Sequence, residues 1–266
     1  MKRRAFLTTS LTATAAAGLG TLTRPVTAAE SSAGGREYYE IRAYRLKEGA
    51  DHALLDGYLE KALIPALNRL GCRPVGAFTE IEPKDGQAVY VLIPYASLDV
   101  FAAVPGRLSR DAEYLQAGAD YLQTPKDKPG FDRIDSWLLL AFAGLPKIEL
   151  PAYCREQKPR IFELRTYESY SETKAQKKVD MFNAGEIETM REVGLGPIFY
   201  GQTSIGRDLP HLMYMTSGEN LEVHAQHWKA FGDHPVWKKL LADPQYADTV
   251  SKAVKRMLKP TAYSQI

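Results

Sequence analysis

Apolar and polar positions along this chain predict strands and helices in one order that occurs twice. In the first half, stretches with a period of two residues predict strands, and apolar residues three and four positions apart predict helices. Pro65 predicts a kink in the first helix, and Gly71 predicts its end. The predicted order is β-α-β-β-α-β, and the second half repeats it. We expect strands at residues 38–46, 74–81, 88–95 and 137–142, and helices at residues 50–70 and 97–122.

One offset of 123 positions relates the two halves. Residues 39–44 (YEIRAY) resemble residues 162–167 (FELRTY), and Gly71 falls on Gly194 at the same offset. Apolar residues of the later strands and helices also correspond. A constant offset over most of each half indicates an internal repeat of domain size rather than a solenoid array.

The repeat predicts two domains and an α+β fold. Residues 37–145 and 160–266 would form the domains, and residues 146–159, which lie between prolines, would link them. The order β-α-β-β-α-β is that of the ferredoxin-like unit. Its antiparallel sheet has helices on one face, so the other face needs a cover. Two tandem copies can cover each other sheet against sheet, which predicts a barrel with an enclosed interior.

Polar residues alternate with apolar ones in the first strand of each half. We expect the apolar set, such as Tyr39 and Ile41, to lie under the helices and the polar set to face the barrel interior. Carboxylate, guanidinium and phenol groups that point into one space can bind a polar ligand. Alternatively, the glutamate and arginine of each strand pair and seal a semi-polar interface. The candidate ligand-binding residues of this set are Glu40, Arg42, Tyr44, Glu163, Arg165 and Tyr167.

Four of the five histidines lie in the second half, and His52 is expected to be exposed on the first helix. His224 and His227 are neighbours on a predicted helix with Trp228, and these three residues are further ligand-binding candidates. Together with His234 beyond the helix, the two imidazoles can ligate a metal or haem iron. Two of the three sister positions in the first half, Phe101 and Val104, are apolar, which favours packing over ligation. We therefore expect no metal site, and the sequence identifies no catalytic residue and leaves the cofactor open.

The first 29 residues have the order of an export signal. Arg3 and Arg4 precede an uncharged, mildly apolar run at residues 7–22, and residues 26–28 (VTA) offer a signal peptidase cleavage site. This order predicts a twin-arginine signal peptide and a periplasmic or secreted protein. No cysteine follows the run to carry a lipid anchor, so we expect no stable membrane insertion after the signal is removed.

Composition narrows the function classes. The chain has 34 Lys and Arg against 32 Asp and Glu, and the first 29 residues hold four of the cations and no acid. The remainder therefore carries 30 cations against 32 acids, which gives no support to nucleic-acid binding. Two cysteines, Cys72 and Cys154, cannot form a disulfide framework or a cysteine zinc site, and whether they pair stays open. Serine-hydrolase, phosphate-loop and dinucleotide motifs are absent from the sequence.

Three motifs resemble those of NIPSNAP-domain proteins. They are residues 162–167 (FELRTY), 228–237 (WKAFGDHPVW) and 259–264 (KPTAYS), and the first half carries a weaker version in which Pro105 and Leu108 replace a tryptophan and a phenylalanine. The resemblance implies two tandem ferredoxin-like domains in a dimeric α/β barrel. It implies no catalytic residues for this chain. The wider barrel superfamily includes haem enzymes and cofactor-free monooxygenases, which is an analogy of fold.

Three functions are compatible with these patterns. The favoured one is an exported protein that binds a small molecule in the barrel interior. The alternative is a haem-dependent or cofactor-free oxidoreductase or monooxygenase that uses the same cavity. A structural module that docks a partner through the second-half helix is the third. The two copies can close one barrel within the chain, or each can pair with a second chain as a homodimer.

Overall fold

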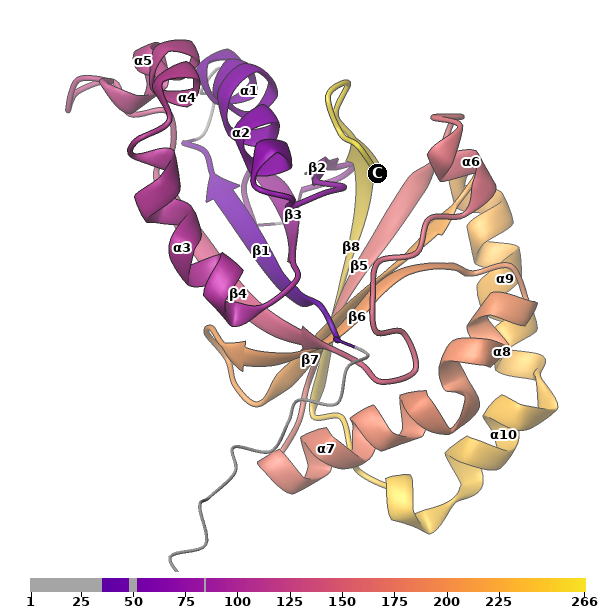
Figure 1. Cartoon of the computed structure of the whole chain (residues 1–266). Helices are drawn as coiled ribbons and strands as arrows, with labels where there is room; N and C mark the ends of the chain where they lie inside the picture. Colours follow the sequence, from indigo (N-terminus) through magenta and orange to yellow (C-terminus); the bar gives the residue numbers. More distant parts are fainter. Residues whose placement is uncertain (1–34, 48–51, 84) are drawn as a thin grey trace, which may run out of the picture. The chain divides into compact units, whose positions relative to one another are not determined.

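The computed structural model describes residues 35–47, 52–83 and 85–266 (Figure 1). The predicted signal peptide lies outside these residues. None of the described helices has the length and apolar character needed to cross a membrane. Both Cys72 and Cys154 are buried and free.

Eight strands form a closed barrel in which every neighbouring pair is antiparallel. The first half contributes the order β4-β1-β3-β2 and the second half contributes β8-β5-β7-β6. Pairing of β2 with β8 and of β4 with β6 closes the barrel within one chain. The strands are β1 (Tyr38–Arg45), β2 (Gly76–Glu80), β3 (Ala88–Tyr95), β4 (Arg133–Ala141), β5 (Ile161–Glu168), β6 (Gly196–Ile205), β7 (His211–Gly218) and β8 (Lys252–Pro260).

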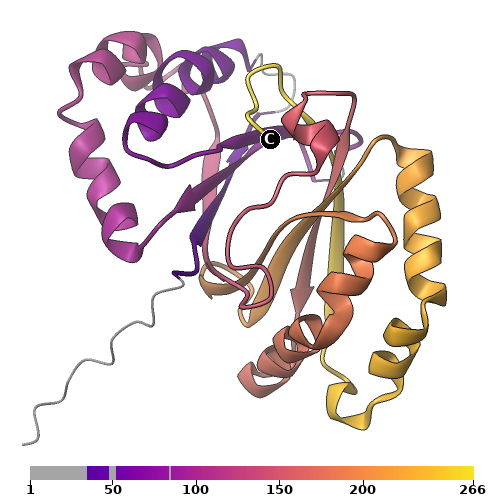
Figure 2. The same cartoon turned by 45° about the vertical axis from the view of Figure 1, so that its right-hand side comes forward.

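The helices of each half cover the outer face of that half's strands (Figures 1 and 2). In the first half they are α1 (Ala53–Tyr58), the π-helix η1 (Leu59–Leu63), α2 (Ile64–Arg69), α3 (Leu98–Leu108), α4 (Ala112–Ala117) and α5 (Ala119–Leu122). In the second half they are α7 (Glu172–Met181), the π-helix η2 (Phe182–Glu186), α8 (Ile187–Glu192), α9 (Leu221–Asp233), α10 (Pro235–Ala242) and the short η3 (Pro244–Tyr246). The connecting segment holds α6 (Ala152–Arg155).

The offset of 123 positions recurs in the element boundaries. β5 and β7 begin 123 residues after β1 and β3, and η2 lies 123 residues after η1. Ser97 and Asn220 cap α3 and α9 in the same way, since each side chain accepts the backbone N–H three residues on. The π-helix η1 directly precedes α2, and Pro65 is the second residue of α2. Between β4 and β8 the offset is shorter by four, because the loop before the last strand is shorter in the second half.

The alternation of the first strands is inverted relative to the expectation. Tyr39, Ile41, Phe162 and Leu164 belong to one apolar cluster that fills the barrel interior together with Phe199. Their polar neighbours face the helices instead. The interior of an eight-stranded barrel is narrow enough for side chains to fill it, and here apolar side chains do so. Charged groups are placed where helices can supply partners, and the prediction of a polar barrel interior is therefore wrong.

Candidate functional site

Glu40 accepts four hydrogen bonds between the first-half sheet and its helices. The Arg42 guanidinium donates through Nε at 2.6 Å and Nη2 at 2.9 Å, and the Tyr95 and Ser136 hydroxyls each donate at 2.8 Å. Burial by itself would raise the pKa of Glu40, but the charge and hydrogen bonds of Arg42 hold it below its usual value. Tyr44 packs edge-on against Phe131 in the same layer. The glutamate–arginine pairing considered from the sequence is thus confirmed here.

Glu163 has the equivalent place in the second half but different partners. It accepts from Arg165 Nε at 2.8 Å, from His224 Nε2 at 2.9 Å and from the Trp228 indole N–H. The Arg165 guanidinium lies 3.5 Å from the centre of the Trp228 ring and donates to the Tyr167 hydroxyl at 3.0 Å. Helix α9 supplies both ring partners because positions 224 and 228 lie one turn apart.

The charged groups and the histidine of this second-half network are buried. Glu163, Arg165 and His224 are 3%, 7% and 3% exposed. Burial by itself would raise the pKa of Glu163, but the hydrogen bond from His224 and the charge of Arg165 lower it. The network brings five of the sequence candidates together and pairs their polar groups with one another, so its arrangement favours a structural role.

The histidines of α9 do not converge on one point. His224 Nε2 is bonded to Glu163, and its Nδ1 is buried against Gly218. A Cβ atom added to Gly218 would lie 2.9 Å from this Nδ1. His227 packs against Gly194, and His234 caps α10 and approaches Glu192 at 3.4 Å. Within residues 35–47, 52–83 and 85–266 no group of three or more His, Cys, Asp or Glu side chains is placed to hold a metal. His224 does not fit an axial ligand of haem iron, since its Nε2 is bonded to Glu163 and its Nδ1 is buried.

The contribution of Glu40 and Glu163 to the free energy of unfolding should depend on pH in the acid range. Both folded pKa values lie below 4.5, so their contribution is complete above pH 4.5 and is lost as the pH falls through the folded values. We expect the free energy of unfolding to fall below about pH 4.5, and to fall less steeply in Glu163→Gln. Urea unfolding at pH 7, 4.5 and 3 measures this. Glu172→Gln, at the exposed start of α7, is the control, and equal slopes in all three proteins would contradict the assignment.

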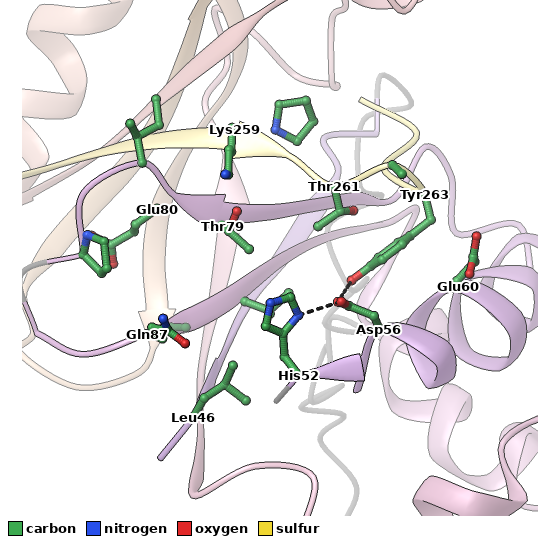
Figure 3. A pocket seen from close by; sticks show the side chains of 16 residues that line it. Leu46, His52, Asp56, Glu60, Thr79, Glu80, Gln87, Lys259, Thr261 and Tyr263 are labelled. Carbon is green, nitrogen blue, oxygen red and sulfur yellow. Dashed lines mark hydrogen bonds and ion pairs between the residues drawn. The ribbon is translucent and has the colours of Figure 1, made fainter. Parts of the chain in front are cut away.

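A cavity of about 620 Å³ lies between α1, the ends of β2 and β3, and the segment after β8 (Figure 3). We call it the His52 cavity. His52 Nδ1 lies 2.6 Å from Asp56 Oδ2, and the Tyr263 hydroxyl donates to Asp56 Oδ1 at 2.6 Å. His52 directly precedes α1, so Asp56 stands one turn further along. Other polar lining residues are Glu60, Thr79, Glu80, Gln87, Lys259 and Thr261.

The bonds around Asp56 fix the roles of the groups at this cavity. Burial and the hydrogen bond to Asp56 raise the pKa of Tyr263, so that its phenol stays protonated and donates. Asp56 accepts the Nδ1 proton of His52, which leaves the lone pair of a neutral ring on Nε2. Nε2 has no partner among the described residues, and Figure 3 shows the ring projecting toward the Thr79 side of the cavity. The arrangement is that of a general base held by a carboxylate.

The sequence reasoning missed this site. The spacing of His52 and Asp56 was a usable signal, since an imidazole and a carboxylate four residues apart meet on a helix. Tyr263 gave no such signal, because it lies 207 residues from Asp56 and reaches it only when the barrel closes. The His52 side chain is 45% exposed, which agrees with its expected exposure.

Comparisons with known proteins agree with the fold. The sequence model of the NIPSNAP family matches residues 39–127 and 162–265. No protein with a curated description matches the chain. A solved structure from Burkholderia xenovorans, described as an uncharacterized NIPSNAP-like domain protein, is 23% identical and covers 40% of this chain and 89% of its own, with a TM-score of 0.36.

Two solved structures cover both halves. A "putative monooxygenase" from Lactobacillus acidophilus NCFM is 11% identical, with a TM-score of 0.56, and covers 85% of this chain and 94% of its own. A protein of the same description from Fusobacterium nucleatum subsp. nucleatum ATCC 25586 is also 11% identical, with a TM-score of 0.55 and coverages of 85% and 93%. At this identity the likeness shows the fold alone.

Proposed function

The chain belongs to the NIPSNAP family, and from that premise we propose that it binds a small organic molecule in the His52 cavity and removes a proton from it. The observation that carries the proposal is the 2.6 Å contact between His52 Nδ1 and Asp56, which leaves Nε2 facing a cavity of about 620 Å³. Ligand sites commonly have volumes of about 300–1,000 Å³. The barrel interior, which the sequence favoured for the ligand, is filled at its centre.

Each group around the cavity has a defined part in this chemistry. His52 Nε2 takes a proton from a weakly acidic C–H or O–H of the ligand, and Asp56 stabilises the imidazolium that forms. The Tyr263 hydroxyl holds the second oxygen of Asp56 and so fixes the carboxylate. Lys259, on the opposite wall, supplies a positive charge for the anion that the proton leaves behind.

A cofactor-free monooxygenase is the second candidate. It is supported by the fold shared with the two proteins named as monooxygenases, together with a base beside a ligand-sized cavity. A carbanion formed by His52 would pass electrons to molecular oxygen. For anthrone, one molecule of O2 would oxidise the C10 methylene to a carbonyl, with one oxygen atom entering the product and the other leaving as water.

Two carbon acids separate the two candidates: anthrone and 2-tetralone. Proton NMR in D2O under argon measures exchange of their acidic hydrogens, and an oxygen electrode measures uptake in air. The base proposal expects exchange of at least one probe faster than in buffer with serum albumin. Oxygen uptake that depends on the same probe would support the monooxygenase function as well. If no probe exchanges faster, the assignment of His52 as a base is wrong.

We further propose that the barrel arose from two tandem ferredoxin-like domains, at residues 37–145 and 160–266. The equal strand orders of the two halves and the shared positions of η1 and η2 support this duplication. Because the two halves close one barrel within the chain, a second chain is not needed to complete it. A homodimer would then form through another surface.

Export by the twin-arginine route is also part of the proposal. Arg3 and Arg4 precede the uncharged run at residues 7–22, and this order is the support for it. Replacing both arginines with lysine is expected to reduce the exported fraction at least tenfold in the native host, because the route reads the arginine pair. Fractionation and blotting measure the result. Lys2→Arg is the control, and unchanged export of the double variant would contradict the route.

A further inference from the structure

A second cavity, of about 340 Å³, lies at one end of the barrel, where β1 and β5 end and β7 and β8 begin. We call it the barrel mouth. It shares no lining residue with the His52 cavity. Its deeper wall includes Tyr90, Leu164 and Met213 from the inner apolar cluster, and Trp137 packs against that cluster. The wall therefore suits a planar apolar body.

His211 contributes the polar group of this wall. Its side chain lines the mouth and the residue is only 2% exposed. Nδ1 lies 3.0 Å from the carbonyl oxygen of Asp208, to which it donates, while Nε2 is buried and has no hydrogen-bond partner. Burial lowers the pKa of His211 against the opposing effect of that carbonyl, so the ring is neutral and Nε2 carries a lone pair. A buried acceptor without a donor costs about 1–3 kcal/mol.

The rim of the mouth is charged, but its cations already have carboxylate partners. Arg45 and Arg207 both bind Asp135, and Lys252 lies 2.8 Å from Glu168. Arg256 donates to Glu80 and to Asp85, each at 2.9 Å. An anionic ligand would have to displace one of these carboxylates. A neutral ligand can bind while these ion pairs stay intact.

We propose that the barrel mouth binds a small neutral aromatic molecule of the phenol class, whose hydroxyl donates to His211 Nε2. The ring lies against the apolar wall formed by Leu164 and Met213, and the hydroxyl supplies the donor that the buried lone pair lacks. The site is independent of the His52 chemistry. It concerns binding, and no bond of the ligand is broken.

A matched ligand pair tests the proposal. p-Cresol and toluene share one ring and one methyl group, and only p-cresol has a donor. Titration of the full chain, followed at the ¹³C-labelled methyl of Met213, is expected to give p-cresol an affinity about tenfold higher than toluene, the value of one hydrogen bond. Met213→Leu identifies the resonance.

Three variants complete the test. His211→Leu should reduce the preference for p-cresol to about one, whereas His52→Gln, in the other cavity, should leave it at about tenfold. Thr166→Phe, which places a larger side chain in the mouth from β5, should weaken both ligands and serves if His211→Leu does not fold. Equal affinities of the two ligands in the wild type, a preference that survives His211→Leu, or one that disappears in His52→Gln would overturn the proposal.

Discussion

Replacing Lys178 with methionine is expected to lower the free energy of unfolding by about 3–5 kcal/mol at pH 8. Lys178 Nζ lies 2.8 Å from Glu186 Oε2 between the second-half sheet and its helices, and the two residues are 4% and 1% exposed. Its ammonium also lies 4.6 Å from the centre of the Phe182 ring. Without Lys178, the buried Glu186 carboxylate loses its hydrogen-bonded cation. Urea unfolding followed by circular dichroism measures the loss.

The pH dependence of the same variant has a defined sign. Burial raises the pKa of Glu186 even though Lys178 opposes the shift, so removal of Lys178 raises it further. An acid with a raised folded pKa takes up its proton first in the folded state. The variant should therefore lose stability as the pH rises from about 4.5 through the folded value, and its deficit should be smaller at pH 5 than at pH 8.

Two further variants serve as controls for this prediction. Lys177→Met removes the neighbouring lysine of α7, whose contact with Asp180 is 3.8 Å long and exposed, and should cost about 0–1 kcal/mol. The double variant Lys178→Met with Glu186→Leu removes both buried charges and should cost less than Lys178→Met alone. Equal losses for Lys177→Met and Lys178→Met would contradict the role of the buried pair.

Local patterns in the sequence were sufficient for the order of the elements. The repeat of residues 39–44 at 162–167 predicted β1 and β5, and the first helical region ends before Gly71 as expected. Capping and strand alternation depend on neighbours a few residues away, which a single sequence contains. The expected last strand of the first half was displaced: β4 begins at Arg133 rather than at residue 137. Its first residues are mostly exposed and carry no apolar alternation.

The sequence could not predict in the same way which face of each strand points into the barrel and which faces the helices. Alternation tells which residues share a face, but both faces of these sheets are buried: all eight residues of β3, and all eight of β7, are buried. Glu163 is directed toward the helices because His224 and Trp228 can bind it there, and that choice depends on packing between segments about 60 residues apart. The pairing of Glu with Arg within each strand was predictable from the sequence. Its position between the sheet and the helices, rather than inside the barrel, was not.

The His52 cavity depends on the least local contact of all. Tyr263 belongs to the segment 259–264, which the sequence marked only through a family resemblance, and the pairing of β8 with β2 is what brings that segment to α1. In the second half, Phe142, which follows β4, packs against Phe182 and Tyr200. Closure of the barrel therefore places a cavity in the half where a histidine precedes the helix.

If His52 is the base, His52→Gln should lower the rate of deuterium exchange of a responsive carbon acid by about 10²–10⁴-fold, the usual contribution of a positioned base. Glutamine keeps the polarity and approximate size of the side chain but cannot take a proton at neutral pH. The dissociation constant of the probe should change by less than about threefold, because the cavity wall is otherwise intact. Rate and affinity are measured together by NMR.

Asp56→Asn tests the second element of the pair. The amide no longer requires Nδ1 to carry the proton, so the ring can present N–H rather than a lone pair to the cavity, and the exchange rate should fall while Tyr263 still has an oxygen to bind. Combined with His52→Gln, the change should add little further loss, since Asp56 acts only through the ring. His227→Gln, on α9, is the control and should exchange at the wild-type rate. A double variant slower than His52→Gln by a further factor equal to that of Asp56→Asn alone would show that the carboxylate acts on the ligand by itself and that the ring is not the base.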